Sequence, residues 1–112
     1  MGMNQILVMM VLLGQFVMAD EKLITDPIVE KAVRKKLEKQ KGELTNTDLG
    51  KVVELNLIYS KITDEGLKEV TKLKNLEELD LNYTQITDAG LKQVAKLQKL
   101  EKLDLRDTQV TD

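Results

Sequence analysis

A 24-residue stretch of this chain is repeated, and the repeat limits the possible folds more than any other feature. The unit at 52–75 aligns with the unit at 76–99, and 13 of the 24 positions are identical. A third copy, 100–112, matches the second unit at nine of its 13 positions. Because one such unit cannot bury its own apolar side, copies must stack on one another. The repeat therefore predicts a row of stacked coils that share one core.

The residue pattern within each unit predicts a short strand followed by a helix. The segment 79–81 alternates between apolar and polar residues, as a strand does. The Thr-Asp pair at 87–88 offers oxygens that can cap a helix, and Leu91, Val94 and Leu97 follow on one face. Gly90 lies in the first turn of this helix, where a missing side chain permits close packing against the neighbouring coil. We expect the Thr-Asp pairs at 63–64 and 111–112 to be helix caps in the same way.

The pattern L-x-x-L-x-L-x-x-T-x-I-T-D-x-G-L over residues 52–112 resembles the leucine-rich repeat family, in particular its ribonuclease-inhibitor-like members and bacterial Thr-Asp-Ala-Gly-Leu repeats. The resemblance implies an α/β solenoid, with parallel strands on the concave face and helices on the convex face. It also implies that the hydroxyl groups at the ninth position of each unit form hydrogen bonds inside the turn. These hydroxyls belong to Ser60, Thr84 and Thr108.

Residues 20–51 precede the repeats and predict a helical N-terminal cap. Asp26-Pro27 is a helix start, with aspartate as the cap and proline at the first helical position. An apolar stripe follows, and we place the end of the helix at Gly42. Thr47 or Asp48 is expected to cap a second, short helical turn that carries Leu49. The stripe consists of Val29, Ala32, Val33 and Leu37.

The remaining surface of this predicted helix is basic, which leaves two interpretations. A basic amphipathic helix can bind an anionic membrane or a partner helix. The end of a repeat stack also needs a polar outer face for solubility, so we favour a cap whose stripe covers the first strand. The segment also resembles the helical caps that precede bacterial leucine-rich repeats of the internalin sort.

Residues 1–19 contain no charged residue, and all charged residues of the chain lie beyond them. The apolar run at 6–13 has the length of the hydrophobic region of a signal peptide and is too short to span a bilayer. Val17 and Ala19 are suitable residues before a cleavage site, so we place cleavage after Ala19. The sequence thus predicts a secreted or periplasmic protein with no membrane span after cleavage. The alternatives are a membrane-anchoring helix and a frayed hydrophobic start of the chain.

The composition excludes several classes of active site. The chain has no histidine and no cysteine, and Ser60 is its single serine, so serine and cysteine hydrolase triads and thiolate zinc sites are ruled out. A net charge of −2 gives no reason to expect nucleic acid as a partner.

Strand residues that point away from the core should form a concave binding face. With a period of 24, equivalent residues of neighbouring strands form columns across the sheet. Successive members of one column lie about 4.8 Å apart, which is the distance between strands. Tyr59 and Tyr83 are the only aromatic residues after residue 19 and fall in one column with Asp107. Tyrosine is a favoured anchor in interfaces, although these rings could also only cover the edge of the turn. The predicted partner-binding residues are Glu54, Asn56, Ile58, Tyr59, Glu78, Asp80, Asn82, Tyr83, Lys102, Asp104 and Arg106.

Two other uses of the carboxylates are possible. Asp80, Asp104 and the nearby Glu78 could act as a general acid/base pair or bind calcium. A strand face that is open to water supplies no enclosed site, so we predict no catalytic residue, no metal and no cofactor. Lysines on the outer helices, at 68, 72, 92 and 96, are expected to be a solvated surface, with a second binding surface as the less favoured alternative.

The sequence therefore favours a non-enzymatic module that binds a protein or peptide, possibly a basic one, through its concave face. The alternative is a structural module that assembles end to end with copies of itself. This alternative rests on the strand expected at 102–106, which would be an unpaired edge with incompletely covered Leu103 and Leu105.

Overall fold

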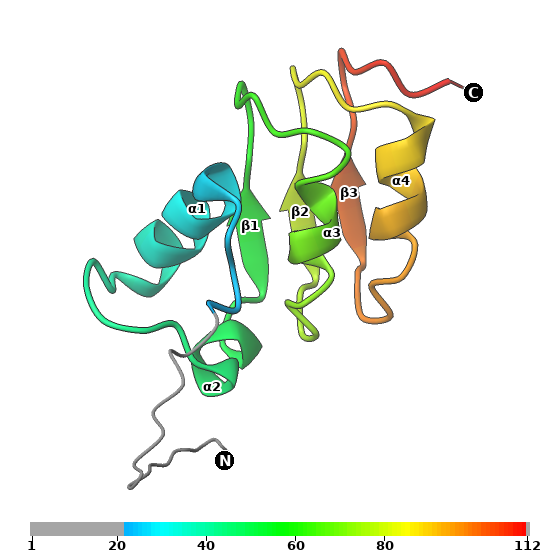
Figure 1. Ribbon diagram of the computed structural model, residues 1–112. Coiled ribbons are helices and arrows are strands. Elements are labelled where there is room, and N and C mark those ends of the chain that lie inside the picture. Colours follow the sequence, from blue (N-terminus) through cyan, green and yellow to red (C-terminus); the bar gives the residue numbers. More distant parts are fainter. Residues whose placement is uncertain (1–21, 112) are drawn as a thin grey trace, which may run out of the picture.

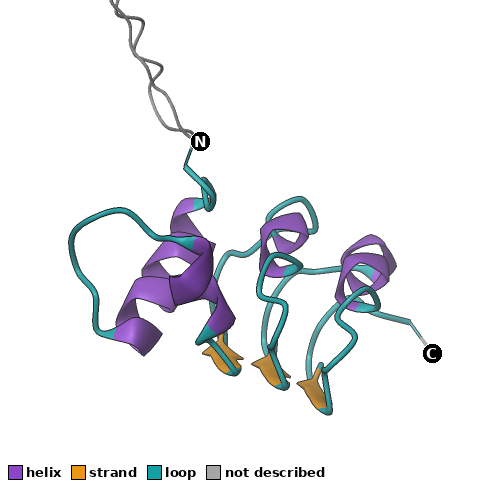
Figure 2. Cartoon of the chain, turned by 90° about the horizontal axis from the view of Figure 1, so that it is seen from below, coloured by secondary structure: helices purple, strands orange, loops and turns teal. Residues whose placement is uncertain are grey.

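The computed structural model describes residues 22–111, which form a row of three coils with a helix at one end (Figure 1). Coil 1 is the unit 52–75, coil 2 is the unit 76–99, and coil 3 begins at residue 100. The strands lie along one side of the row and the helices of the coils lie along the other (Figure 2). The predicted export segment 1–19 lies outside the described residues.

The sheet consists of three short parallel strands in the order β1-β2-β3. They are β1 (Glu54–Asn56), β2 (Glu78–Asp80) and β3 (Lys102–Asp104). Neighbouring strands pair with an offset of one repeat, so each residue lies beside its equivalent in the next coil. The central leucines of the strands point into the core, and their neighbours form the two predicted columns Glu54-Glu78-Lys102 and Asn56-Asp80-Asp104.

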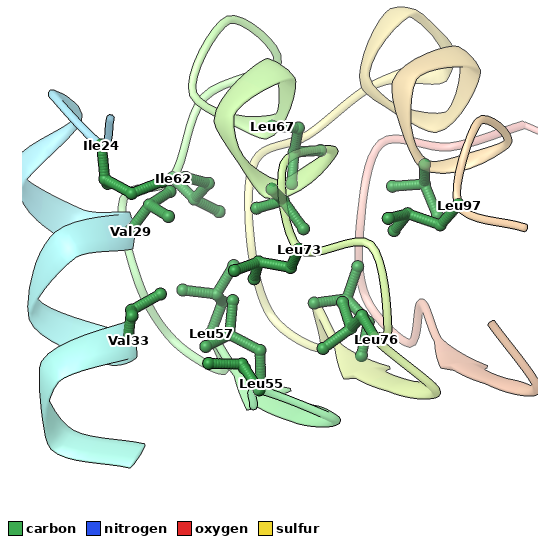
Figure 3. Packing of buried hydrophobic residues seen from close by; sticks show 14 of the residues in the cluster. Ile24, Val29, Val33, Leu55, Leu57, Ile62, Leu67, Leu73, Leu76 and Leu97 are labelled. Carbon is green, nitrogen blue, oxygen red and sulfur yellow. The ribbon is translucent and has the colours of Figure 1, made fainter. Parts of the chain in front are cut away.

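One hydrophobic cluster runs through the row of coils (Figure 3). In coil 2, Leu79, Leu81 and Ile86 are at most 2% exposed, because this coil has a neighbour on each side. Complete burial of such a side chain contributes roughly 1.5–3 kcal/mol, so contacts between coils supply most of the driving force for folding. The equivalent residues of coil 1 are buried just as well, which requires cover on the side away from coil 2.

Helix α1 (Pro27–Leu37) supplies that cover at the N-terminal end of the row. The Asp26 carboxylate accepts hydrogen bonds from the amides of Ile28 and Val29, as expected for a helix cap. Val29 and Val33 are fully buried and point toward coil 1 (Figure 3), while Ala32 and Leu37 are partly buried against the same cluster. The predicted helix start and apolar stripe are therefore confirmed.

The end of α1 was predicted wrongly. The helix ends at Leu37, and Glu38 follows in the left-handed conformation with φ of 55°. The amide of Glu38 donates to the carbonyl of Arg34 and so closes the last turn. The Arg34 guanidinium donates to the carbonyl groups of Lys39 and Gly42, at 3.2 and 2.8 Å, and holds the loop in place. Glycine is the common residue for this backbone conformation, which made Gly42 the more obvious end in the sequence.

Helix α2 (Asn46–Gly50) is the predicted short turn that carries the buried Leu49, but its cap is Thr45. The Thr45 hydroxyl accepts from the amide of Asp48, and the Asp48 carboxylate accepts from the amide of Thr45. In this reciprocal capping box, Asp48 lies in the first turn of the helix. The prediction had placed it before the helix, as a possible cap.

Polar contacts also join the segment before α1 to coil 1. The Glu69 carboxylate, on coil 1, accepts hydrogen bonds from the backbone amides of Thr25 and Asp26, the latter at 2.9 Å. Lys72, from the same coil, donates to the carbonyl of Leu23 at 2.5 Å. Partial burial of Glu69 would raise its pKa, but the hydrogen bonds from these amides and from Lys72 outweigh that effect and lower the pKa.

The helices of the coils are short and differ in length. Helix α4 (Asp88–Val94) has the predicted cap, since the Thr87 hydroxyl accepts from the amide of Ala89 at 3.2 Å. Helix α3 (Leu67–Val70) begins three residues after the predicted Thr-Asp cap of coil 1. There the Thr63 hydroxyl accepts from the amide of Gly66 and stabilises a turn before the helix.

The aspartates of the Thr-Asp pairs link consecutive coils, a role that the prediction of simple helix caps missed. The Asp64 carboxylate accepts from the amide and the hydroxyl of Thr87 in the next coil, at 2.8 and 2.6 Å. Asp88 binds Thr111 in the same way, at 2.8 and 2.5 Å. Each aspartate thus satisfies two donors of the following coil, and these bonds lower the pKa of Asp88.

The glycine that follows each Thr-Asp pair makes room for this link. A Cβ atom on Gly66 would lie 2.7 Å from Oδ2 of Asp26 and 2.8 Å from Cδ1 of Ile62. A Cβ atom on Gly90 would meet Oδ1 of Asp64 and Cδ1 of Leu67. The prediction that this position allows close packing against the neighbouring coil is therefore confirmed.

Alanine at either of these glycines should destabilise the fold. We expect Gly66→Ala and Gly90→Ala each to lower the free energy of unfolding by about 1–3 kcal/mol, because the added methyl group displaces buried neighbours. Gly50→Ala is the matched control, since its Cβ would lie 3.5 Å from the nearest atom, Nδ2 of Asn75. This control should be neutral or stabilising by up to about 1 kcal/mol. Urea denaturation followed by circular dichroism checks the prediction, which is wrong if all three variants unfold at the same urea concentration.

The charge of Asp48 matters for stability. The pKa of Asp48 is lowered to about 2, first by the hydrogen bond from Lys39 at 2.8 Å and then by the amide of Thr45. Hydrogen bonds from Arg34 and Lys22 also lower the pKa of Glu30. A carboxyl group with a lowered pKa in the folded state favours folding above its unfolded pKa.

Stability should therefore fall between about pH 4 and pH 2, as these carboxylates are protonated and lose their bonds. Asp48→Asn keeps the shape of the side chain but cannot take up this proton. We expect its urea midpoint to fall less steeply over this range than that of the unchanged chain, although it should be lower at pH 7. Parallel profiles of the two proteins below pH 4 would contradict the role of Asp48.

Candidate functional site

A groove crosses the outer face of the three strands. The strand side chains on this face are polar and alternate with the buried leucines, so the floor of the groove is the sheet itself. Its N-terminal end is formed by Lys36 on α1, which was not among the predicted site residues. The charged and polar residues that line the groove are Lys36, Glu54, Asn56, Glu78, Asp80, Lys102 and Asp104.

The groove contains more carboxylates than lysines. One of its carboxylates forms an ion pair with one of its lysines. Lys36 lies 3.0 Å from the Glu54 carboxylate. Glu78, Lys102 and Asp104 form no ion pair or side-chain hydrogen bond with any other residue in the range 22–111. The middle and the C-terminal part of the groove therefore present charges that a partner can bind.

In the column Asn56-Asp80-Asp104, the first two side chains have a structural role. Oδ1 of Asn56 accepts from the amide of Ile58, and Oδ1 of Asp80 accepts from the amide of Asn82, both at 2.9 Å. These bonds to the backbone two residues ahead stabilise the turn after the strand. The amide of Arg106, the equivalent donor in coil 3, binds Asn82 instead. Asp104 is thus the member of this column whose carboxylate is not used by its own turn.

Asn82, one of the predicted partner-binding residues, is buried and does not line the groove. It is 6% exposed, and its Oδ1 accepts from the amide of Arg106 at 2.6 Å. This bond joins coil 2 to coil 3, and it buries a side chain that a partner would need to reach. Ile58 at the equivalent position of coil 1 is half-buried, whereas Arg106 in coil 3 is exposed.

The two tyrosines stack on each other at the C-terminal end of the strands. Their ring centroids are 4.7 Å apart and the ring planes differ by 7°. Tyr59 is 71% exposed and Tyr83 is 38% exposed, so the pair is a surface feature. Both residues have a left-handed backbone, with φ of 60° and 59°, and Asp107 repeats this conformation in coil 3.

This backbone conformation is unfavourable for tyrosine, at a cost of about 1–2 kcal/mol per residue. The same turn in each coil imposes it, and the stacking of the rings offsets part of the cost. A shallow groove runs beside the pair and is lined by residues of the turn, among them Ser60, Lys61 and Gln85. The tyrosines therefore form an exposed apolar surface next to polar groups.

The hydroxyl groups at the ninth position bond within their own turns, as the resemblance implied. Thr84 and Thr108 donate to the carbonyl groups of Leu81 and Leu105, at 2.8 and 2.9 Å. Ser60 accepts from the amide of Ile62 at 3.3 Å. The three hydroxyl groups therefore support their own turns.

Residues 22–111 include no cluster of three or more acidic side chains arranged to hold a metal ion. Over the same residues, no helix has the length and apolar character that a membrane span requires.

Comparison with known proteins agrees with the repeat and with the fold. The pattern described as leucine-rich repeats in two copies matches residues 74–112, and the single leucine-rich repeat matches residues 51–70. Together these ranges are more than half of the chain. The chain belongs to the leucine-rich repeat family. The predicted α/β solenoid with parallel strands is thereby confirmed. No curated protein matches the sequence.

Several solved structures resemble this leucine-rich repeat protein. An internalin, inlF, from Listeria monocytogenes is 29% identical, with a TM-score of 0.64 over 78% of this chain and 25% of its own. Internalin C2 from the same species is 30% identical, with a TM-score of 0.61 over 74% and 36%. The CBM51-2 and INT domains of Clostridium perfringens ZmpB share the fold at 24% identity, with a TM-score of 0.57 over 82% and 19%. The chain thus spans about a quarter to a third of the internalins that it matches.

Proposed function

We propose that this leucine-rich repeat chain is a non-enzymatic module that binds a protein or peptide across the outer face of its sheet. The observation that carries the proposal is the groove over β1, β2 and β3, whose floor presents side chains fixed by the parallel register. Rigid strands hold these groups in place before binding, so little conformational entropy is lost when a partner binds. This function needs no cofactor.

The partner should be basic. The groove contains four carboxylates, Glu54, Glu78, Asp80 and Asp104, and Lys36 neutralises the first of them. Opposite charge on a partner would steer its approach and make binding sensitive to salt. The stacked Tyr59 and Tyr83 lie at the strand ends and would add apolar contact area to an interface.

Charge-neutral and aromatic substitutions test this proposal. A partner captured from a native extract would be titrated against Glu78→Gln/Asp104→Asn and against Tyr59→Ala/Tyr83→Ala. Neither Glu78 nor Asp104 takes part in a side-chain hydrogen bond within residues 22–111, so the first pair should keep the fold. We expect each pair to weaken binding about tenfold or more, and the first pair also to reduce its salt dependence.

Lys92→Glu/Lys96→Glu is the control, because both lysines lie on the convex side and are exposed. Lys72 is less suitable, since it also binds Leu23 and Glu69. Loss of binding in this convex pair, with unchanged binding in the groove and tyrosine pairs, would place the interface on the helices and overturn the proposal.

We also propose that residues 20–51 act as the N-terminal cap of the repeats. Burial of Val29 and Val33 against coil 1 supports this role, as does the basic outer surface of α1. The cap would supply the polar end that a stack of coils requires.

The uncharged segment 1–19 supports export of the chain, which would place the binding face outside the cell or in the periplasm. The exported protein should begin at Asp20 and contain no methionine, because all five methionines lie before the predicted cleavage site. N-terminal sequencing and intact mass of the protein from the medium or the periplasm test this. Recovery of the chain from soluble cytosol with Met1 or the uncleaved segment still attached would contradict it.

A further inference from the structure

The face of α1 that points away from coil 1 carries exposed lysines. Val29 and Val33 point toward coil 1 (Figure 3), and Lys31 and Lys35 lie one helical turn apart on the opposite face. The loop after the helix adds Lys41, and all three lysines are exposed. Lysine is almost never buried without a partner, so the exposure of this face follows from its own side chains.

The charges of these three lysines are not neutralised within the described part of the chain. Lys31, Lys35 and Lys41 form no ion pair or side-chain hydrogen bond with any other residue in the range 22–111. Lys36 and Lys39, which are close to them in the sequence, are paired with carboxylates at 3.0 and 2.8 Å. The three free ammonium groups can therefore attract an anionic ligand.

A groove lies between α1 and the loop 38–42, and all three lysines line it. Arg34 holds the two sides of this groove together, because its guanidinium donates from the helix to the carbonyl groups of Lys39 and Gly42 in the loop. Its third nitrogen, Nε, donates to Glu30 at 2.9 Å. Arg34 is thus fully used within the cap and fixes the place of Lys41 relative to the helix.

The groove offers apolar contacts as well as charge. Pro27 lines it, and the long side chains around it contribute their methylene groups. An extended chain that carries both carboxylates and apolar groups could use both kinds of contact. A flat membrane surface could not, because no large hydrophobic side chain of α1 is exposed for insertion.

The polar residues of the loop favour a peptide over a phosphate polymer. Glu38 lines the groove and has no ion pair within residues 22–111. Its carboxylate would repel a densely charged polyphosphate, but it can accept hydrogen bonds from the backbone amides of a peptide. Gln40, which also lines the groove, can both donate to and accept from a peptide backbone.

We propose that the groove between α1 and the loop 38–42 binds an acidic peptide segment of a partner protein through Lys31, Lys35 and Lys41. This site shares no lining residue with the groove on the sheet face, which favours a basic partner. The chain would thus have two docking surfaces of opposite charge. The second surface gives the N-terminal segment a role beyond covering coil 1.

A labelled synthetic peptide of alternating glutamate and alanine tests the proposal, with fluorescence anisotropy on the full chain as the measurement. We expect Lys31→Gln/Lys35→Gln/Lys41→Gln to weaken binding about tenfold, since each exposed ion pair contributes modestly. Binding to the unchanged chain should also weaken as salt is added. The matched control is Lys68→Gln/Lys92→Gln/Lys96→Gln, which removes three charges from exposed lysines on the convex side and should bind like the unchanged chain.

Arg34→Lys tests the positioning role of Arg34 without a change of net charge. Lysine cannot bond to both loop carbonyl groups, so this variant should weaken peptide binding about as much as Lys41→Gln does. Because both changes act through Lys41, Arg34→Lys/Lys41→Gln should bind no more weakly than either single variant. Additive losses would reject this role. Circular dichroism shows whether each variant is folded.

Polyphosphate and vesicles that contain phosphatidylglycerol are the competing probes. No binding of the acidic peptide, or equal losses in the two triple variants, would overturn the proposal. Tighter binding of polyphosphate or of the vesicles than of the peptide, lost in Lys31→Gln/Lys35→Gln/Lys41→Gln, would assign the groove to that anion and also reject an acidic peptide. Glu78→Gln/Asp104→Asn should not weaken peptide binding, so this test is separate from that of the sheet face.

Discussion

The parallel pairing of strands at an offset of 24 residues is the constraint on which the remaining structure depends. It places Leu55, Leu79 and Leu103 in one line and the polar strand residues in another. A shift of one residue would turn the leucines to solvent and the carboxylates into the core, so the register is fixed by the hydrophobic effect. The same pairing sets the spacing of the charges in the groove, and the candidate binding face is therefore a direct result of core packing.

Small residues and carboxylates act together where the coils meet. Gly66 and Gly90 have no Cβ atom, which would displace Asp26 and Asp64. Asp64 can therefore accept hydrogen bonds from both donors of Thr87. Both roles depend on the close approach of neighbouring coils. Asp26, which lies before the repeats, occupies the same kind of place beside Gly66 while it caps α1. The N-terminal segment thus meets coil 1 much as one coil meets the next.

Periodicity predicted the strands, the core and the columns, because each depends on burial and spacing that repeat along the sequence. Details that depend on one side chain were harder to predict. By spacing alone, Asn82 is equivalent to Ile58 and Arg106 on the predicted binding face, yet its side chain binds the backbone of Arg106 and is buried. The end of α1 at Leu37 could not be read from the sequence, because Arg34 stabilises the following loop through carbonyl groups several residues away. The left-handed tyrosines follow from turn geometry that hydropathy does not record.

The aspartate links give the row of coils a direction. Asp64 serves coil 2 and Asp88 serves coil 3, and each carboxylate belongs to the earlier coil while the donors belong to the later one. If coil 3 detaches, Asp88 loses both donors, and water can replace them because Asp88 is already exposed. If coil 1 detaches, Thr87 and the packing around Gly90 are disturbed in the centre of the row. The links between the described coils therefore all run the same way, and coils 2 and 3 each depend on an aspartate of the coil before them.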